Sequence, residues 1–294
     1  MRFVSYNIQY GFGRDGTYDL ARAISAVADA DVIALQEVER HWARTGFDDQ
    51  PEMISRLLPD HYWVYGPAFD MDASFRDGTG RLVNRRRQFG TMLLSRTPIR
   101  WSRLHLLPMR KVVSPLNTQN PALEGLIETK AGPVRVFSLH LAHIGADERL
   151  EQIDFLMARH RRVHIEGGPW SGTDDEPARK WSSGEGEPAA PQAAIWMGDF
   201  NSEPGSAEYR RIVGETPYHQ GAVYADGFVD AGLAAGTPPE DLITHERMFR
   251  GAEQRRRLDY CFVSGELAAK VRSSHVDLLA AGSDHQPVWT EIDL

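Results

Sequence analysis

The chain has 294 residues, and 33 Lys and Arg against 41 Asp and Glu give it a net charge of −8 at pH 7. Its 41% hydrophobic and 25% charged residues are typical of a globular protein and exclude wholesale disorder, while the acidic balance argues against broad non-specific binding to nucleic acids but not against a local basic groove. No apolar run approaches the roughly 20 residues that a membrane-spanning helix needs, so no transmembrane segment is expected.

The first 40 residues predict a strand, a helix and a second strand. Residues 2–8 alternate like a strand with one buried face, residues 19–30 carry apolar side chains at helical spacing, and residues 31–37 form a short apolar run. A unit of this length predicts two parallel neighbours in one sheet. Asn7 and Glu37 then fall at the same carboxyl-terminal edge, where α/β folds bind ligands.

Downstream, the pattern predicts more strands and two more helices. Lys-Ala-Gly-Pro at residues 130–133 is a turn signal that makes a hairpin of the strands on either side. An amphipathic helix is predicted over 147–160, with Asp147 near its start. The other predicted elements are strands at 89–95, 124–129, 134–141, 193–199, 257–264, 275–279 and 287–292, a helix at 207–213 and a turn at 266–270.

Residues 166–192 are rich in Gly, Pro, Ser and acidic side chains and predict an irregular loop insertion. Trp170 and Trp181 are its only large apolar residues. One interpretation is a long surface loop, since such a composition offers little to bury. The other is a lid over the substrate, whose tryptophans pack on the ligand or on the body of the protein.

Residues 69–88 form a second irregular segment, with arginines at positions 81, 85, 86 and 87. A charge run of this kind is usually a solvated face. It can also supply cations for phosphate, because the guanidinium fork matches the geometry of phosphate oxygens. Arg85 and Arg87 are therefore candidate substrate-binding residues, together with Arg257 from the later run at 255–257.

The segment 196–204 carries the most informative polar pattern. An apolar strand ends at Gly198 and then presents Asp199 and Asn201, whose side chains point to the same side if the chain is extended. A carboxylate and an amide at the end of a strand can position a water, a hard cation or an anionic oxygen. The alternative is an ordinary turn, because Gly, Asp, Asn, Ser and Pro all favour turns.

Asp284 and His285 place a hard metal ligand beside a group that can hold a proton near neutral pH. Asp259 interrupts an apolar strand, where it either faces solvent or faces inward and needs a partner, since an isolated buried carboxylate is costly. His285 is the candidate partner. His140 lies near the end of a predicted strand, and taken alone it favours a structural role over a catalytic one.

Six segments in this order resemble the endonuclease/exonuclease/phosphatase superfamily, which has the deoxyribonuclease-I-like fold. They are residues 5–10 (SYNIQY), 35–37 (LQE), 138–141 (SLHL), 198–201 (GDFN), 258–260 (LDY) and 283–287 (SDHQP), and residues 89–96 (FGTMLLSR) also resemble a strand of the family. The resemblance covers residues 2–292. It implies a single domain over 1–294, a four-layered α/β/β/α sandwich of two packed mixed sheets, with 166–192 as an insertion.

The resemblance also implies a metal-dependent phosphoric ester hydrolase. Glu37 is similar to the family's principal ligand of Mg²⁺, with Mn²⁺ as a substitute, and Asn7 and Asp284 would be further oxygen donors. An all-oxygen site suits Mg²⁺, and the absence of a Cys/His cluster in the sequence argues against zinc.

The remaining matched residues would act on water and phosphate. Asp199 resembles the residue that orients or deprotonates the attacking water, and Asn201 would hold that water or a phosphate oxygen. His285 would contact the phosphoryl group while Asp259 fixes its ring, and His140 would add charge on the other side.

The family leaves the substrate open, since it includes nucleases, deadenylases, sphingomyelinases and inositol-phosphate phosphatases. Residues 257–260 (RLDY) disfavour the inositol 5-phosphatase branch, whose pattern carries Cys-Asp-Arg there. The first hypothesis is a Mg²⁺-dependent phosphodiesterase or phosphatase acting on a small molecule or lipid headgroup. The second is a nuclease on DNA or RNA, and the third is a non-catalytic module that binds a phosphorylated ligand.

The cysteine content and the first residues bear on location. Cys261 is the single cysteine, which suits a reducing compartment, and the chain turns polar too early for the apolar region of a signal peptide. A cytoplasmic location is therefore expected, and the sequence leaves the oligomeric state open.

Overall fold

In the computed structural model, which describes residues 1–173, 176, 182–214, 222, 224–249 and 252–294, the first sheet is built on the predicted strand–helix–strand unit. β1 (Arg2–Asn7) and β2 (Val32–Arg40) pair in parallel and are joined by α1 (Leu20–Ser25), which Asp19 caps. The strand order is β15–β16–β1–β2–β6–β3, with β3 Tyr62–Asp72, β6 Arg86–Ser95, β15 Val271–Val276 and β16 Val288–Ile292.

The second sheet contains the predicted hairpin. β8 (Pro121–Thr129) and β9 (Gly132–His140) are antiparallel, whereas β10 (Ala194–Asp199) runs parallel to β9 and antiparallel to β14 (Asp259–Ser264). The strand order is β11–β14–β10–β9–β8–β7, with β7 Ile99–Leu106 and β11 Phe228–Asp230. In this register Asp199 lies opposite both His140 and Asp259, so three polar residues share one edge.

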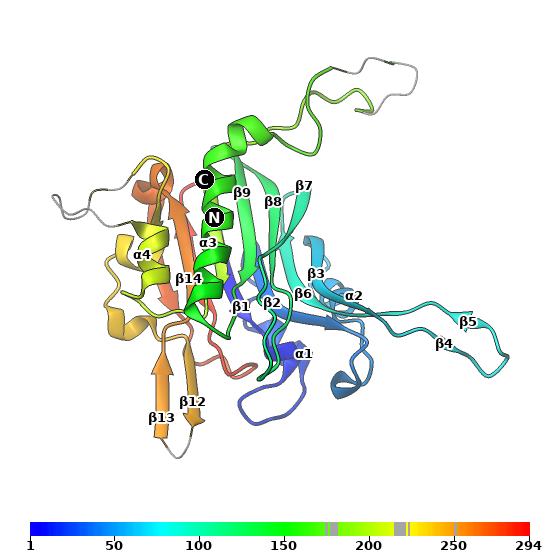
Figure 1. Cartoon of the computed structure of the whole chain (residues 1–294). Helices are drawn as coiled ribbons and strands as arrows, with labels where there is room; N and C mark the ends of the chain where they lie inside the picture. Colours follow the sequence, from blue (N-terminus) through cyan, green and yellow to red (C-terminus); the bar gives the residue numbers. More distant parts are fainter. Residues whose placement is uncertain (174–175, 177–181, 215–221, 223, 250–251) are drawn as a thin grey trace.

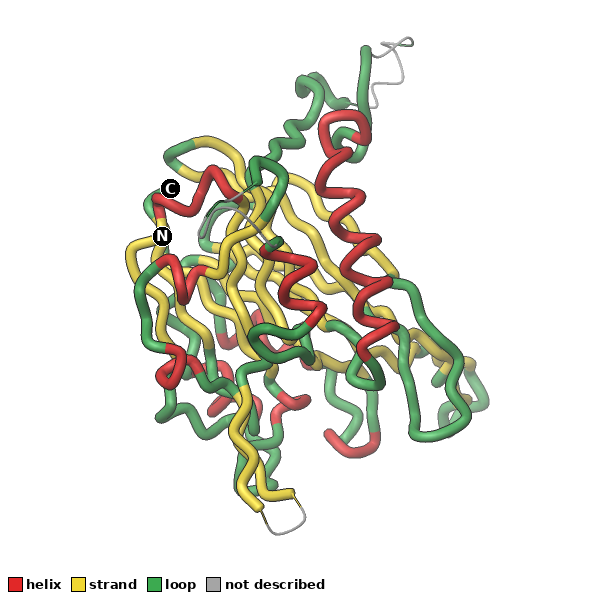
Figure 2. The backbone as a smooth tube through the Cα atoms, turned by 60° about the vertical axis from the view of Figure 1, so that its left-hand side comes forward, coloured by secondary structure: helices red, strands yellow, loops and turns green. Residues whose placement is uncertain are grey.

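Apolar side chains separate the layers. Phe3, Leu93 and Met197 belong to the core between the two sheets. α1 and α2 (Gln50–Leu57) cover the outer face of the first sheet, and α3 (Ala146–Glu166) and α4 (Ala207–Val213) cover that of the second (Figures 1 and 2). The fold is the expected four-layered α/β/β/α sandwich. No helix among the described residues is long and apolar enough to span a bilayer.

Several elements differ from the sequence prediction. α1 ends at Ser25 instead of residue 30, α3 continues to Glu166, and the strand predicted at 275–279 is β15, which ends at Val276. The elements that the pattern missed include the edge strands β3 and β7, α2, α5 (Ala231–Ala234) and the hairpin of β12 (His245–Phe249) and β13 (Ala252–Arg256). Edge strands and a projecting hairpin bury little surface, so their apolar periodicity is weak.

Residues 69–88 are not irregular. β3 and β6 pair as far as Asp72 and Arg86, and the short strands β4 (Phe75–Arg76) and β5 (Leu82–Val83) extend the pair into a long hairpin. Figure 1 shows this hairpin, which we call the arm (residues 69–88), projecting from the body of the sandwich.

The insertion at 166–192 begins at the C-terminal end of α3 (Figure 1). Its described residues after Glu166 contain neither helix nor strand. Arg135, near the start of β9, donates a hydrogen bond to the Pro191 carbonyl, whereas His140 ends the same strand. The described part of the insertion therefore attaches at the end of the sheet opposite to His140, and the lid interpretation is wrong for it; Trp181 lies outside the described residues.

Candidate active site

Asn7 joins the ends of the two sheets. It is the last residue of β1, and its Nδ2 donates hydrogen bonds to Asp199 Oδ2 and to Glu37 Oε1, each at 3.1 Å. Its own Oδ1 accepts from the Gln9 amide at 3.0 Å. Because Asn7 and Asp199 end strands of different sheets, this buried bridge fixes the carboxylates of Glu37 and Asp199 beside each other.

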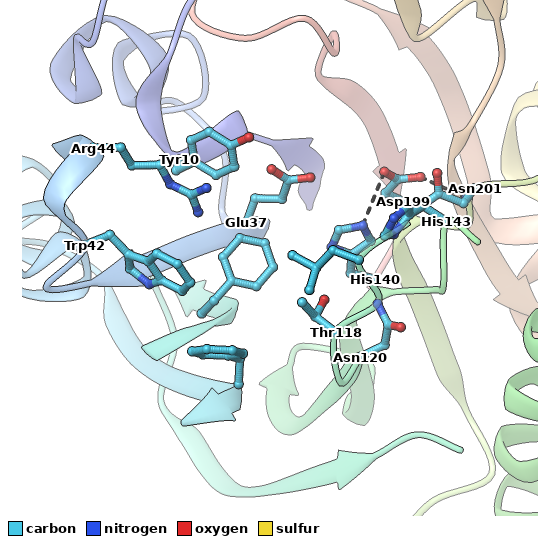
Figure 3. A pocket seen from close by; sticks show the side chains of 13 residues that line it. Tyr10, Glu37, Trp42, Arg44, Thr118, Asn120, His140, His143, Asp199 and Asn201 are labelled. Atoms are coloured by element: carbon cyan, nitrogen blue, oxygen red, sulfur yellow. Dashed lines mark hydrogen bonds and ion pairs between the residues drawn. The ribbon is translucent and has the colours of Figure 1, made fainter. Parts of the chain in front are cut away.

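Glu37 reaches the site through a backbone irregularity. The pairing of β2 with β6 shifts register between Leu35 and Val38, and Glu37 inside this bulge has a φ of 59°. A β-bulge re-aims a side chain, and a left-handed φ is costly for any residue but glycine. Figure 3 shows the Glu37 carboxylate among the side chains that line a pocket. The sequence pattern of β2 gave no sign of this bulge.

Asp259 faces inward and holds His285. The Asp259 side chain is fully buried, and its Oδ2 lies 2.7 Å from His285 Nδ1. Burial disfavours the charged imidazole, but the carboxylates of Asp259 and Asp199 outweigh it and raise the pKa of His285 to about 10. His285 therefore carries a positive charge at neutral pH.

Two imidazoles flank the Asp199 carboxylate. Asp199 Oδ2 lies 3.7 Å from His140 Nε2 and 3.8 Å from His285 Nε2. Asp199 Oδ1 accepts a hydrogen bond of 2.8 Å from the backbone amide of Asn201, and Asn201 itself has a φ of 48°. The side chain of Asn201 donates to the Leu141 carbonyl at 2.9 Å. The predicted pair at 199 and 201 is thus held by its own turn next to both histidines.

Asp284 lies at the same end of the molecule, with a neighbour that the sequence did not single out. Asp284 Oδ2 accepts from Gln9 Nε2 at 3.1 Å and lies 3.6 Å from Nε2 of His245, whose side chain is buried. The His245 ring centroid is 4.7 Å from that of His285. His245 starts the unpredicted hairpin β12–β13, and the only available signal was a lone histidine in a segment without periodicity.

A cavity of about 280 Å³ opens beside this cluster (Figure 3). Glu37, His140 and Asp199 form one side of it, and aromatic rings and Arg44 form the other. The lining residues are Tyr10, Glu37, Trp42, Arg44, Phe69, Phe89, Leu116, Thr118, Asn120, His140, His143, Asp199 and Asn201. The aromatic wall was missed because its members come from separate loops and strands.

The three predicted substrate-binding arginines have different surroundings. Arg85 and Arg87 lie on the arm outside the cavity lining, although Arg87 stacks on Trp42, with 4.9 Å from its Cζ to the ring centroid. Arg257 does not line the cavity, in contrast to its prediction as a substrate-binding residue. It is buried and its Nη2 lies 2.7 Å from Asp230 Oδ1, because a guanidinium removed from water needs a carboxylate partner.

The oxygen donors at this end fit a divalent cation. Among the described residues Glu37 accepts one hydrogen bond, from Asn7, which leaves its second carboxylate oxygen open to a ligand. Asp284 adds a second carboxylate, and it groups with His245 and His285 in a set whose ligand-type atoms all lie within 4.8 Å of one another. Carboxylate and amide oxygens are the ligands that hard divalent cations prefer.

The chain is similar along its length to several solved structures. An endonuclease/exonuclease/phosphatase family protein from Leptotrichia buccalis C-1013-b shares 18% identity over 100% of both chains with a TM-score of 0.63. Mannosyl-6-phosphatase Bt3783 from Bacteroides thetaiotaomicron VPI-5482 shares 17% over 100% of both chains with a TM-score of 0.58. The human Nocturnin catalytic domain with bound sulfate shares 18% over 100% of this chain and 94% of that one, with a TM-score of 0.59.

These likenesses show the deoxyribonuclease-I-like fold, and a search of curated protein sequences found no match. The model of the Endonuclease/Exonuclease/phosphatase family matches residues 4–285, which is nearly the whole chain. The chain therefore belongs to this family of phosphoester hydrolases.

Proposed function

We propose that the protein is a Mg²⁺-dependent phosphodiesterase that acts on a small substrate bound at the cavity, with Mn²⁺ able to replace Mg²⁺. The observation that carries the proposal is the position of the Asp199 carboxylate, which lies within 4 Å of two imidazoles and opens onto the cavity of about 280 Å³. A carboxylate that can take a proton from water, beside imidazoles that can donate hydrogen bonds to phosphate oxygens, suits hydrolysis at phosphorus.

Glu37, Asp284 and Asn7 would hold the cation. Their oxygen atoms and the open side of the Glu37 carboxylate fit Mg²⁺, which keeps several waters and binds through one or two carboxylates. The bound cation would act as a Lewis acid that offsets negative charge on the phosphate oxygens.

The chain's own residues would divide the remaining work. Asp199 accepts a proton from the attacking water, whose oxygen bonds to phosphorus as the ester bond to the leaving oxygen breaks. His285, charged at neutral pH, and His140 donate hydrogen bonds to the phosphate oxygens from either side of Asp199, while Asn201 holds the water or a phosphate oxygen. Groups that stabilise such charge are worth about 10²- to 10³-fold each in rate.

The cavity favours a compact substrate with a planar ring. Its volume of about 280 Å³ lies at the lower end of the range for small-molecule sites. The rings of Trp42 and Phe69, with centroids 5.2 Å apart, and the guanidinium of Arg44 line it. A small phosphodiester with such a ring, or a lipid headgroup of similar size, would place its phosphate at the histidines. The nuclease alternative is favoured by a separate observation, namely that arginines and exposed aromatic rings lie against each other on the arm.

The proposal is tested by assaying bis-p-nitrophenyl phosphate, p-nitrophenyl phosphate, oligonucleotides and phospholipids with Mg²⁺, Mn²⁺ or EDTA. We expect Mg²⁺-dependent diester cleavage that falls about 10²- to 10³-fold in Glu37→Gln and Asp199→Asn. Glu128→Gln, the same change at an exposed residue paired with Arg100, is the control and should stay active. Full activity in Asp199→Asn would contradict the mechanism. Metal binding without turnover of any phosphoester would favour a non-catalytic binding module.

A further inference from the structure

Aromatic rings and guanidinium groups alternate from the cavity out along the arm. Arg44 Cζ lies 3.7 Å from the centroid of the Tyr10 ring and 4.6 Å from that of Trp42. Arg87 Cζ follows at 4.9 Å from the Trp42 centroid and 5.9 Å from that of Phe69. Tyr10, Trp42 and Phe69 all line the cavity, so this stacked series begins beside the catalytic cluster.

The series continues at Arg85. Its Cζ lies 5.1 Å from the Phe47 centroid and 4.8 Å from that of Phe75. Residues 85 and 87 point to the same side because side chains alternate along an extended chain. We call the set formed by Tyr10, Trp42, Arg44, Phe47, Phe69, Phe75, Arg85 and Arg87 the stacked row.

Arg85 and Arg87 lack the partners that surface arginines usually have. Within the described part of the chain neither forms an ion pair, and their Nε atoms are buried without a hydrogen-bond partner. Arg86, which points to the opposite side, pairs with Asp70 at 2.8 Å. Among the described residues, Arg85 and Arg87 therefore present two cations without ion pairs on the face of the arm that carries the rings, in a protein whose net charge is −8.

Two rings of the stacked row are also exposed. Phe47 is 50% and Phe75 44% accessible to solvent, which is unusual for large apolar side chains unless they contact a partner. Rings that accept stacked bases and arginines that bind the backbone are the two features with which proteins hold single-stranded nucleic acids. A duplex keeps its bases stacked inside and would leave these rings without partners.

We propose that the stacked row binds a single-stranded nucleic acid, whose chain runs along the arm from a phosphate held beside Asp199. Bases stack on the exposed rings, and Arg85 and Arg87 contact the phosphates between them. This assignment rests on the phosphodiester chemistry of the proposed function and concerns its nuclease alternative, in which the bond cleaved belongs to a polymer.

Binding is measured without turnover, in EDTA, by the fluorescence anisotropy of a fluorescein-labelled twelve-residue oligothymidylate over a series of salt concentrations. The double variant Arg85→Gln/Arg87→Gln should bind at least about tenfold more weakly. Its slope of log affinity against log salt should be shallower by about 1.4, because each phosphate contact on a single strand contributes about 0.7. Phe75→Ala should lose about tenfold in affinity with an unchanged slope, since it removes stacking alone.

The matched control is Arg100→Gln/Arg272→Gln, which removes the same charge from two exposed arginines outside the arm. Equal loss of affinity in this control would overturn the assignment, because it would show a general charge effect. Equal affinity of the wild type for a twelve-pair duplex would overturn it as well. The assignment would also be overturned if the arm variant lost its binding to phosphatidylserine vesicles but kept its binding to oligothymidylate.

Hydrolysis of bis-p-nitrophenyl phosphate separates this inference from the proposed function. Diester cleavage by a wild type that does not bind oligothymidylate overturns the inference and leaves the proposed function standing. Binding that depends on Arg85 and Arg87, in a protein that cleaves no phosphoester, supports the stacked row and overturns the proposed function.

Discussion

Replacing Glu37 with glycine is expected to stabilise the fold relative to alanine while abolishing turnover. Glu37 has a φ of 59° inside the bulge of β2, and this conformation places its carboxylate beside Asn7 and Asp199. Alanine removes the carboxylate but retains the unfavourable backbone, whereas glycine removes both. The comparison therefore isolates the conformational cost of holding a metal ligand in place.

The expected magnitude follows from two opposing terms. A left-handed conformation costs an L-residue about 1–2 kcal/mol, and glycine does not pay it. Glycine in a strand costs about 0.5–1 kcal/mol more than alanine through the entropy of the unfolded chain. Glu37→Gly should thus exceed Glu37→Ala in free energy of unfolding by up to about 1.5 kcal/mol.

Glu291 provides a matched control, since it is an exposed glutamate in β16 and has no positive φ. There Glu291→Gly should be less stable than Glu291→Ala by about 0.5–1 kcal/mol. Urea unfolding of all four variants in EDTA gives the four free energies, and diester cleavage with Mg²⁺ gives activity. A Glu37→Gly variant no more stable than Glu37→Ala would refute the argument that the site stores backbone strain.

Three further outcomes are expected. Asp259→Asn should remove one of the carboxylate charges that raise the pKa of His285 to about 10, so the alkaline limit of the rate profile, near pH 10 in the wild type, should move toward neutral pH; an unchanged profile would exclude a charged His285 from the rate. Burial lowers the pKa of His160 to about 4, so the folded protein keeps this imidazole neutral. As the pH drops from 6.5 to 4 the unfolded chain binds a proton that the folded chain does not, and the free energy of unfolding should fall by up to about 3 kcal/mol more than in His160→Gln. Arg257→Ala should cost about 3–5 kcal/mol in urea unfolding by leaving Asp230 buried and unpaired, with KM unchanged; a raised KM in a stable variant would return Arg257 to the substrate.

The sequence was informative where local pattern and topology act together. The alternation at residues 2–8 and the apolar run at 31–37 predict two parallel strands, and parallel strands end at the same edge of a sheet. Asn7 and Glu37 could therefore be placed side by side from the sequence alone. In the structure Asn7 Nδ2 lies 3.1 Å from Glu37 Oε1. The ordered motifs extended this to His140 and Asp199, which lie opposite each other in the register of β9 and β10.

The rest depends on contacts that no local pattern encodes. Arg257 follows two other arginines and resembles a surface charge run, but its orientation is set by Asp230, which is distant in sequence and buried against it. His245 reaches Asp284 only because the hairpin β12–β13 starts beside the loop before β16. The left-handed Glu37 is a third case, since a bulge is visible only in the pairing of β2 with β6.

The central claim is that carboxylates and imidazoles from distant segments form one metal-dependent site for phosphodiester cleavage. The most direct test measures Mn²⁺ binding by electron paramagnetic resonance and bis-p-nitrophenyl phosphate cleavage on the same samples of wild type, Glu37→Gln and Asp199→Asn. The account predicts that Glu37→Gln loses both the bound Mn²⁺ and turnover, while Asp199→Asn retains the metal and loses about 10²- to 10³-fold in rate. Wild-type metal binding and wild-type turnover in Glu37→Gln would contradict it.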